Sequence, residues 1–147
     1  MATILIVDDD VLIRDTLHQL LSAAHECHTA DRAEQALAYL DIETYDVVVT
    51  DISMPGLSGR ELLRYIQAKH PATPVIVISG MLTAENEVDG KELLDLGAFA
   101  YFNKHFKLEE IETAVERAIE RRQELMSANQ SKDTAATEES PDTDASA

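Results

Sequence analysis

Short runs of apolar residues recur along this chain, and each is followed by a longer stretch of mixed polarity. In the run Asp46–Thr50, three valines follow one another, so a strand there is apolar on both faces. Side chains branched at the β-carbon favour strands, and strands apolar on both faces are typical of parallel sheets covered by helices on each side. The predicted strands are Ile4–Val7, Glu26–Ala30, Asp46–Thr50, Pro74–Ile78 and Phe99–Phe102.

The stretches between these runs carry apolar residues at helical spacing. Leu62, Leu63 and Ile66, for example, fall on one face of a helix that His70-Pro71 ends. Strands and helices alternate without a hairpin signal, which predicts an α/β fold with a parallel, doubly wound sheet and right-handed connections. The predicted helices are Val11–Ala24, Ala33–Leu40, Leu57–Lys69, a shortened helix before Gly97, and Leu108–Met126.

The length of 147 residues fits one domain, but the composition changes near the end of the chain. Residues 127–147 contain no large apolar side chain and consist largely of Ser, Thr, Ala and acidic residues. Such a segment cannot bury enough surface to offset the entropy lost when it becomes ordered. We therefore predict a folded domain over residues 1–126 and a disordered acidic tail over residues 127–147.

Composition also limits the cellular compartment and the kinds of binding partner that we expect. No apolar run reaches the roughly 18 residues that a membrane span needs, and no basic leader precedes the first strand. The one cysteine cannot form an internal disulfide, so we predict the cytoplasm. The 12 basic and 28 acidic side chains give a net charge of −16. This charge argues against direct DNA binding, which needs clustered Lys and Arg, and favours protein partners and a divalent cation.

Polar side chains follow four of the predicted strands. Asp8 and Asp9 follow the first strand, Asp51 the third, Ser79 the fourth and Lys104 the fifth. The carboxyl ends of parallel strands meet at one edge, and neighbouring strands lie ~5 Å apart. Carboxylates that close repel each other, and a divalent cation such as Mg²⁺ relieves the repulsion. With the positive charge of Lys104 and the hydroxyl of Ser79, these are the parts that phosphoryl transfer needs.

Simpler roles for the same residues remain open at this point. The acidic run Asp8–Asp10 can cap the helix that follows, and we expect this role for Asp10. Asp51 can be a plain turn residue, and Ser79 and Lys104 can be an incidental strand end and a solvated lysine.

The segment His25-Glu-Cys27-His28 also offers metal-ligating side chains. On a strand, His25 and Cys27 point to one face and His28 to the other, so the three cannot close around one ion. We therefore predict Cys27 in the core and both histidines on the surface.

Four motifs, in this order, resemble the receiver domain of bacterial response regulators. They are Ile4-Leu-Ile-Val-Asp-Asp9, Val47-Val-Val-Thr-Asp51-Ile-Ser-Met-Pro-Gly56, Val77-Ile-Ser79-Gly80 and Gly97-Ala-Phe-Ala-Tyr101-Phe-Asn-Lys104. The resemblance covers roughly residues 2–122. It implies a flavodoxin-like fold, in which a doubly wound parallel sheet of five strands has the order 2-1-3-4-5.

The resemblance also implies a role for each residue of the site. Asp51 is expected to accept a phosphoryl group from a phosphohistidine on a sensor histidine kinase or His-phosphotransfer protein. Asp9, Asp51 and the backbone carbonyl of Ser53 are expected to bind Mg²⁺, with Asp8 acting largely through a metal-bound water. After transfer, Ser79 and Lys104 are expected to contact the phosphoryl oxygens. The aromatic ring of Tyr101 is then expected to swing inward and alter a protein-interaction face.

This sequence departs from the family pattern at two places. His105 stands where the family usually has a proline after the lysine, and a cis bond before a non-proline residue costs ~2.5–4 kcal/mol, so we predict a trans bond here. The chain between Ser79 and Gly97 is longer than usual, and we predict a loop over Met81–Gly90.

The final helix carries its apolar stripe towards Met126. Two interpretations stay open: a docking surface for a partner or a second copy of the chain, or a longer packing helix.

The sequence thus predicts a single-domain, stand-alone response regulator that catalyses only its own phosphorylation and dephosphorylation and acts on an unknown downstream protein. One alternative is a receiver fold that docks partners without phosphorylation. Another is a phosphatase of the haloacid-dehalogenase kind with Asp8 as nucleophile, although Leu12 occupies the position of that family's threonine.

Overall fold

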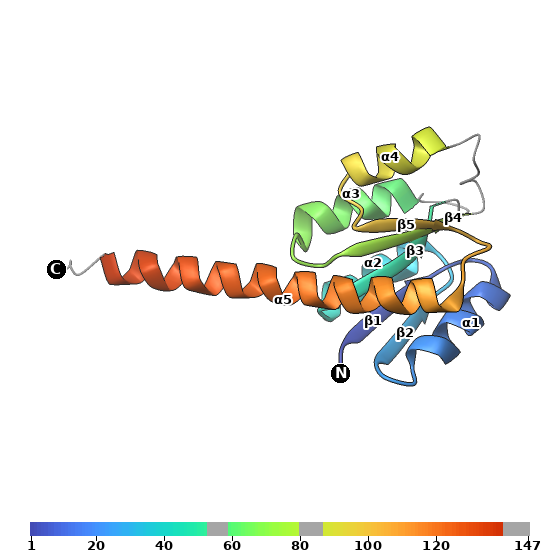
Figure 1. The fold of residues 1–147 in the computed structure, drawn as a ribbon, viewed down its shortest axis with the longest axis horizontal. Coiled ribbons are helices and arrows are strands. Elements are labelled where there is room, and N and C mark those ends of the chain that lie inside the picture. Colours follow the sequence, from blue (N-terminus) through green and yellow to red (C-terminus); the bar gives the residue numbers. More distant parts are fainter. Residues whose placement is uncertain (53–58, 80–86, 140–147) are drawn as a thin grey trace.

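A computed structural model describes residues 1–52, 59–79 and 87–139, with side chains described outside 87–90 and 129–139. Five parallel strands form one sheet in the order β2-β1-β3-β4-β5. Their bounds are β1 Thr3–Val7, β2 Glu26–Ala30, β3 Val47–Asp51, β4 Val75–Ser79 and β5 Ala100–Asn103. The predicted fold class and strand order are confirmed, and the helices lie on both sides of the sheet (Figure 1).

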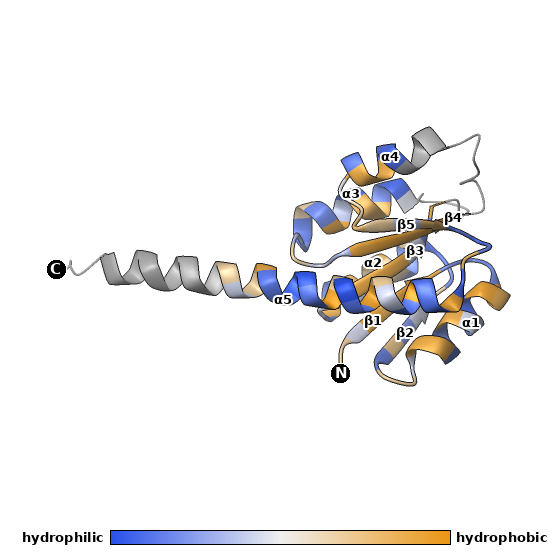
Figure 2. Cartoon of the chain, viewed as in Figure 1, coloured by the Kyte–Doolittle hydropathy of each residue, from blue (hydrophilic) through white to orange (hydrophobic). Residues whose placement is uncertain are grey.

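Helices cover each face because the strand residues alternate between two cores. On one face, Leu5 and Val48 pack with the buried residues of α2, α3 and α4. On the other face, Ile4 and Val47 pack with those of α1 and α5. The bounds are α1 Val11–Leu21, α2 Ala33–Ile42, α3 Gly59–Lys69, α4 Glu87–Asp95 and α5 Leu108–Glu139. Figure 2 shows the resulting hydrophobic layer of strands between helices whose surfaces carry many hydrophilic residues.

The first helix begins as the sequence suggested. The side chain of Asp10 accepts a hydrogen bond from the backbone N–H of Leu12 at 3.0 Å, which satisfies one of the free donors of the first turn. Asp10 is therefore the N-cap of α1. The helix ends at Leu21, earlier than the predicted Ala24.

Two predicted boundaries differ from the structure. Helix α4 already begins at Glu87 and includes Gly90, so residues 87–90 are helical and not part of the predicted loop; residues 80–86 lie outside the described part. Helix α5 continues through residues 127–139, which we had placed in a disordered tail. Neither Gly nor Pro occurs between Leu108 and Pro141, so nothing in the local sequence ends the helix at Met126. Residues 140–147 are outside the described residues.

Arg122 fixes the middle of α5 to the opposite end of the sheet from the polar strand ends. Its guanidinium donates to Asp46 Oδ1 at 2.9 Å, to the carbonyl of Ala72 at 3.1 Å and to Thr73 Oγ1 at 3.3 Å. These partners precede β3 and β4. The helix therefore packs along the whole sheet as far as Arg122. Among the large apolar residues of α5 whose side chains are described, Leu108 and Met126 are exposed. No helix among the described residues is both long and apolar enough to cross a membrane.

Candidate functional site

The register of the strands brings the polar strand ends to one edge of the sheet. Val7 pairs with Thr50, Asp51 with Ile78 and Ser79 with Asn103. The residues just beyond these pairs, Asp8 and Lys104 among them, therefore meet at the carboxyl edge, as expected for parallel strands.

Three carboxylates cluster there. One oxygen from each of Asp8, Asp9 and Asp51 lies within 4.8 Å of the others. Asp8 and Asp51 are almost completely buried, at 1% and 2% exposure, whereas Asp9 is exposed. Two carboxyl groups buried at the end of a hydrophobic sheet, with a third that is exposed, form a concentrated acidic site.

Lys104 partly neutralises this cluster. Lys104 Nζ lies 3.1 Å from Asp51 Oδ2 and 3.4 Å from Asp8 Oδ1. Burial lowers the pKa of Lys104, but the hydrogen bond to Asp51 and the charges of Asp8 and Asp51 outweigh it, so the pKa is raised above its ordinary value. Lys104 is therefore charged and links the two buried carboxylates.

Asp8 is held in place from several directions. Its Oδ1 accepts the backbone N–H of Asp10 at 2.8 Å, and its carbonyl accepts from the Arg14 guanidinium at 2.8 Å. Burial raises the pKa of Asp8; the Asp10 hydrogen bond and Lys104 lower it and the charge of Asp51 raises it further, giving a value of about 6. Ionising Asp8 beside Asp51 is therefore unfavourable, and an added cation would relieve this.

Of the remaining predicted residues, Ser79 and Tyr101 lie on the neighbouring strands β4 and β5. Ser79 is fully buried at the end of β4, the neighbour of β3. Tyr101 lies two residues before Asn103, half-buried, and packs against the core beneath α2, α3 and α4. Ser53, whose carbonyl was the fourth predicted Mg²⁺ ligand, lies outside the described residues.

His105, at the position where the family usually has proline, does not prevent Lys104 from contacting Asp8 and Asp51. No cis peptide bond occurs in the described ranges, so the Lys104–His105 bond is trans, as predicted. The backbone N–H of His105 donates to the side chain of Asn103 at 2.8 Å, which closes the turn after β5.

Gly59 is a residue of this site that the motif analysis did not single out. Its N–H donates to the carbonyl of Ile52 at 3.0 Å, and a Cβ placed on it would lie 2.3 Å from the carbonyl oxygen of Asp51. Only glycine lets the start of α3 approach the end of β3 so closely. The signal in the sequence was a second glycine soon after Pro55-Gly56.

Comparisons with known proteins agree with this geometry. Residues 4–116 match the response regulator receiver domain. The chain belongs to this family. It is 40% identical over 121 residues to the DNA-binding transcriptional regulator NtrC of Salmonella typhimurium, a match that covers 81% of this chain and 25% of the relative. The chain thus spans about a quarter of the length of the NtrC proteins it matches.

Solved structures agree as well. A response regulator receiver domain protein from Clostridium thermocellum superposes with a TM-score of 0.77 at 30% identity, over 85% of this chain and 99% of that one. NtrX from Brucella abortus superposes with a TM-score of 0.79 at 36% identity, over 87% of this chain and 29% of that one.

The donor set of this receiver domain fits Mg²⁺. The site offers carboxylate oxygens, the ligands that this cation prefers. Two of these carboxylates are buried, and burial, with a further contribution from the charge of Asp51, raises the pKa of Asp8 despite the nearby Lys104. Asp8, Asp9 and Asp51 are the described residues that would hold the ion, and it would supply positive charge for phosphoryl oxygens.

We expect Asp8→Asn to flatten the pH dependence of stability in divalent-free buffer. The folded state holds the Asp8 proton more tightly than the unfolded state, so unfolding releases it between pH 3.8 and about 6. Stability is therefore lost as the pH rises through this window. The shift corresponds to a loss on the order of 3 kcal/mol, which the variant should avoid.

Denaturant unfolding at several pH values measures this effect. Asp15→Asn, which removes an exposed carboxylate of α1, serves as the control and should retain the wild-type slope. Equal slopes for the wild type and Asp8→Asn would show that Asp8 is not the group responsible.

Proposed function

We propose that this receiver domain is a phosphorylation-operated switch in which Asp51 accepts a phosphoryl group from a phosphohistidine of a histidine kinase or His-phosphotransfer protein. The observation that carries the proposal is the position of Lys104, 3.1 Å from Asp51, next to the Asp8–Asp9–Asp51 cluster. Catalysis of phosphoryl transfer depends mainly on positioning and on neutralising charge, and both are present here.

The described residues perform the transfer as follows. A carboxylate oxygen of Asp51 forms a bond to phosphorus while the P–N bond to the donor imidazole breaks. The electron pair of that bond stays on the imidazole nitrogen. The ammonium of Lys104 offsets the negative charge brought by the phosphoryl oxygens. Asp51, the last residue of β3, is held in place because β3 is paired with β1 and β4.

The switch is proposed to run through Ser79 and Tyr101. Ser79 lies on the strand next to β3, where a hydroxyl can donate to an oxygen of the phosphorylated Asp51. Tyr101 is half-buried on the adjacent β5, so its ring can become more or less exposed without leaving the core as a whole. The protein-interaction face would then change at β5 and its neighbouring helices.

Incubation of the protein with acetyl phosphate and Mg²⁺, followed by intact mass spectrometry, tests the proposal. We expect the mass of one phosphoryl group to be added. The adduct should be absent in Asp51→Asn and absent when Mg²⁺ is chelated. Asp41→Asn, which changes a carboxylate of α2 remote from the site, serves as the control and should be modified like the wild type.

The same experiment separates the alternatives. No adduct, in a protein shown to bind Mg²⁺, would favour a docking module that works without phosphorylation. Turnover of a phosphate ester that survives Asp51→Asn but not Asp8→Asn would favour the phosphatase. The phosphatase role would leave the close pair of Asp51 and Lys104, 3.1 Å apart, without a function.

Partners and location complete the proposal. A net charge of −16 supports action through proteins and not through direct DNA contact by these residues, although the NtrC relatives are DNA-binding regulators. Three further points remain predictions: that the domain stands alone, that it is cytoplasmic, and that it catalyses only its own phosphorylation and dephosphorylation. So does a docking role, or pairing with a second copy, for α5.

A further inference from the structure

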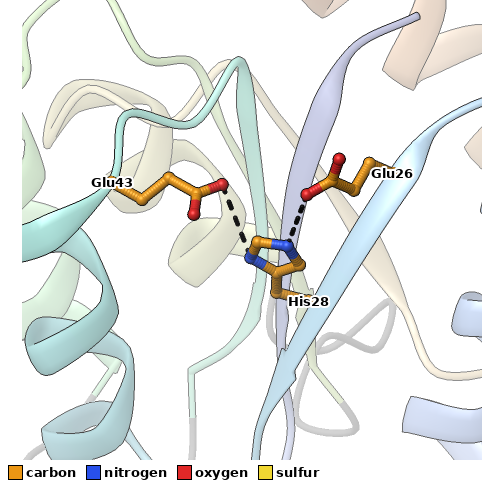
Figure 3. Close-up of side chains that lie close together, drawn as sticks. All are labelled: Glu26, His28 and Glu43. Carbon is orange, nitrogen blue, oxygen red and sulfur yellow. Dashed lines mark hydrogen bonds and ion pairs between the residues drawn. The ribbon is translucent and has the colours of Figure 1, made fainter.

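We propose that Glu26, His28 and Glu43 form a second cation site, which takes a divalent transition metal such as Zn²⁺. Glu26 and His28 point to the same face of the edge strand β2, and Glu43 directly follows α2 (Figure 3). Glu26 pairs with Thr3 at the start of β1, whereas the phosphoacceptor site follows the last residue of that strand. The two sites therefore lie towards opposite ends of the sheet, and this proposal is independent of the role of Asp51.

The imidazole lies between the two carboxylates. His28 Nε2 is 2.8 Å from Glu26 Oε2, and Nδ1 is 3.7 Å from Glu43 Oε2 (Figure 3). One ligand atom from each residue lies within 4.8 Å of the others. Neighbouring ligands of a tetrahedral zinc ion are about 3.4 Å apart at the usual bond lengths. Glu26 already lies on the Nε2 side of the ring, where the ion would bind, whereas Glu43 lies on the Nδ1 side and has to rotate towards Nε2 to reach it. Both glutamate side chains are exposed, at 51% and 41%, so this rotation is open to Glu43.

Tyr45 orients the ring from its other nitrogen. The Tyr45 hydroxyl lies 2.7 Å from His28 Nδ1, and the two rings pack edge to face at 5.4 Å. Tyr45 itself is 1% exposed, so it is a rigid support. Histidines that bind metals usually have the second ring nitrogen fixed in this way, which directs the first towards the ion.

The charge of the cluster suits a cation. Among the described residues, Glu26 and Glu43 form ion pairs with His28 alone and with no Lys or Arg. A neutral imidazole with two carboxylates leaves a net negative charge at the surface. An imidazole donor suits zinc, copper or nickel better than it suits Mg²⁺. The sequence interpretation excluded a site from His25, Cys27 and His28; the partners of His28 are instead acidic residues on its own face.

Binding changes the position of one proton. An ionised Glu26 can only accept a hydrogen bond, so the 2.8 Å contact assigns the ring proton of the metal-free protein to Nε2, where the ion would replace it. The ring then carries its proton on Nδ1 and donates it to the oxygen of the Tyr45 hydroxyl, which is both donor and acceptor. No oxidation and no covalent step is involved.

Calorimetric titration of the full chain with Zn²⁺, in saturating Mg²⁺ so that the Asp8–Asp9–Asp51 cluster is occupied, tests the proposal. We expect His28→Gln and Glu26→Gln each to weaken Zn²⁺ binding at least about tenfold, and Tyr45→Phe to weaken it about tenfold through the orientation of the ring. His18→Gln, which removes an exposed imidazole of α1, should leave the affinity unchanged.

Imidazole ¹⁵N spectra give a readout that does not depend on the affinity. Zn²⁺ should shift the Nε2 resonance of His28, and Mg²⁺ alone should not. Glu26 and Glu43 are exposed, so Glu26→Gln and Glu43→Gln test the site even if the half-buried His28 variant folds poorly. Unchanged Zn²⁺ affinity in Glu26→Gln and Glu43→Gln, or an unshifted His28 resonance, would overturn the proposal.

Discussion

Lys104→Ala is expected to slow the phosphorylation of Asp51 by acetyl phosphate by about 100-fold or more, because it removes the only side-chain cation seen to contact the described carboxylates of the site. The ammonium neutralises charge that appears on the phosphoryl oxygens in the transition state. A small donor is the right substrate for this measurement, since it needs no docking surface.

The same variant should also lose stability when divalent cations are absent. Removing one partner of a buried ion pair leaves the other charge uncompensated, at a cost on the order of 3 kcal/mol. One of the two carboxyl groups can take up a proton, which limits this loss, and Mg²⁺ should recover much of it. The loss is expected in chelator and should be smaller in Mg²⁺.

Lys107→Ala is the matched control for both effects. Lys107 is an exposed cation in the same β5–α5 connection, so its removal changes the net charge equally without touching Asp51. If the two variants were phosphorylated at the same rate, Lys104 would contribute only to the overall field of the protein and not to the reaction.

Gly59→Ala is expected to destabilise the domain by about 3 kcal/mol or more and to abolish phosphorylation. The added Cβ would lie 2.3 Å from the carbonyl oxygen of Asp51 and 2.6 Å from Cα of Ile52. Both are backbone atoms, so no side chain can rotate away. The end of β3 has to move, and Asp51 moves with it away from Lys104.

Chemical denaturation and the rate of acetyl phosphate labelling measure the two consequences. Ala68→Gly, at an exposed position of the same helix, provides a control for helix propensity and should cost about 1 kcal/mol with normal labelling. Normal labelling in Gly59→Ala would contradict the close approach of α3 to the site.

Much of this fold could be predicted because its strands are unambiguous. The consecutive valines of β3 are buried on both faces, as their pattern required. Once the sheet is parallel, the convergence of Asp8, Asp51 and Lys104 follows from the ends of their strands and needs no knowledge of the side-chain contacts.

Helix ends were less predictable because local sequence gives only a weak signal there. Gly90 is tolerated inside α4, where glycine costs only about 1 kcal/mol relative to alanine. The extension of α5 past Met126 has no apolar face that a sequence pattern could detect. The role of Arg122 could not be predicted from the sequence, because its partners Asp46 and Thr73 are distant along the chain and contact it only in the folded protein.

The same limit applies to contacts between distant elements. Glu43 lies 15 residues after His28, and only the packing of the segment after α2 against β2 brings the two together. The approach of Gly59 to Asp51 likewise depends on how α3 begins beside β3.

The most direct test of the central claim is to locate the phosphoryl group. Acetyl phosphate-treated protein is reduced with borohydride, which converts an acyl phosphate of aspartate to homoserine, and the digest is sequenced by tandem mass spectrometry. We predict homoserine at position 51 alone, in an amount that depends on Mg²⁺. Conversion at Asp8 or Asp9, or none in a protein that binds Mg²⁺, would contradict the assignment of Asp51 as the phosphoacceptor.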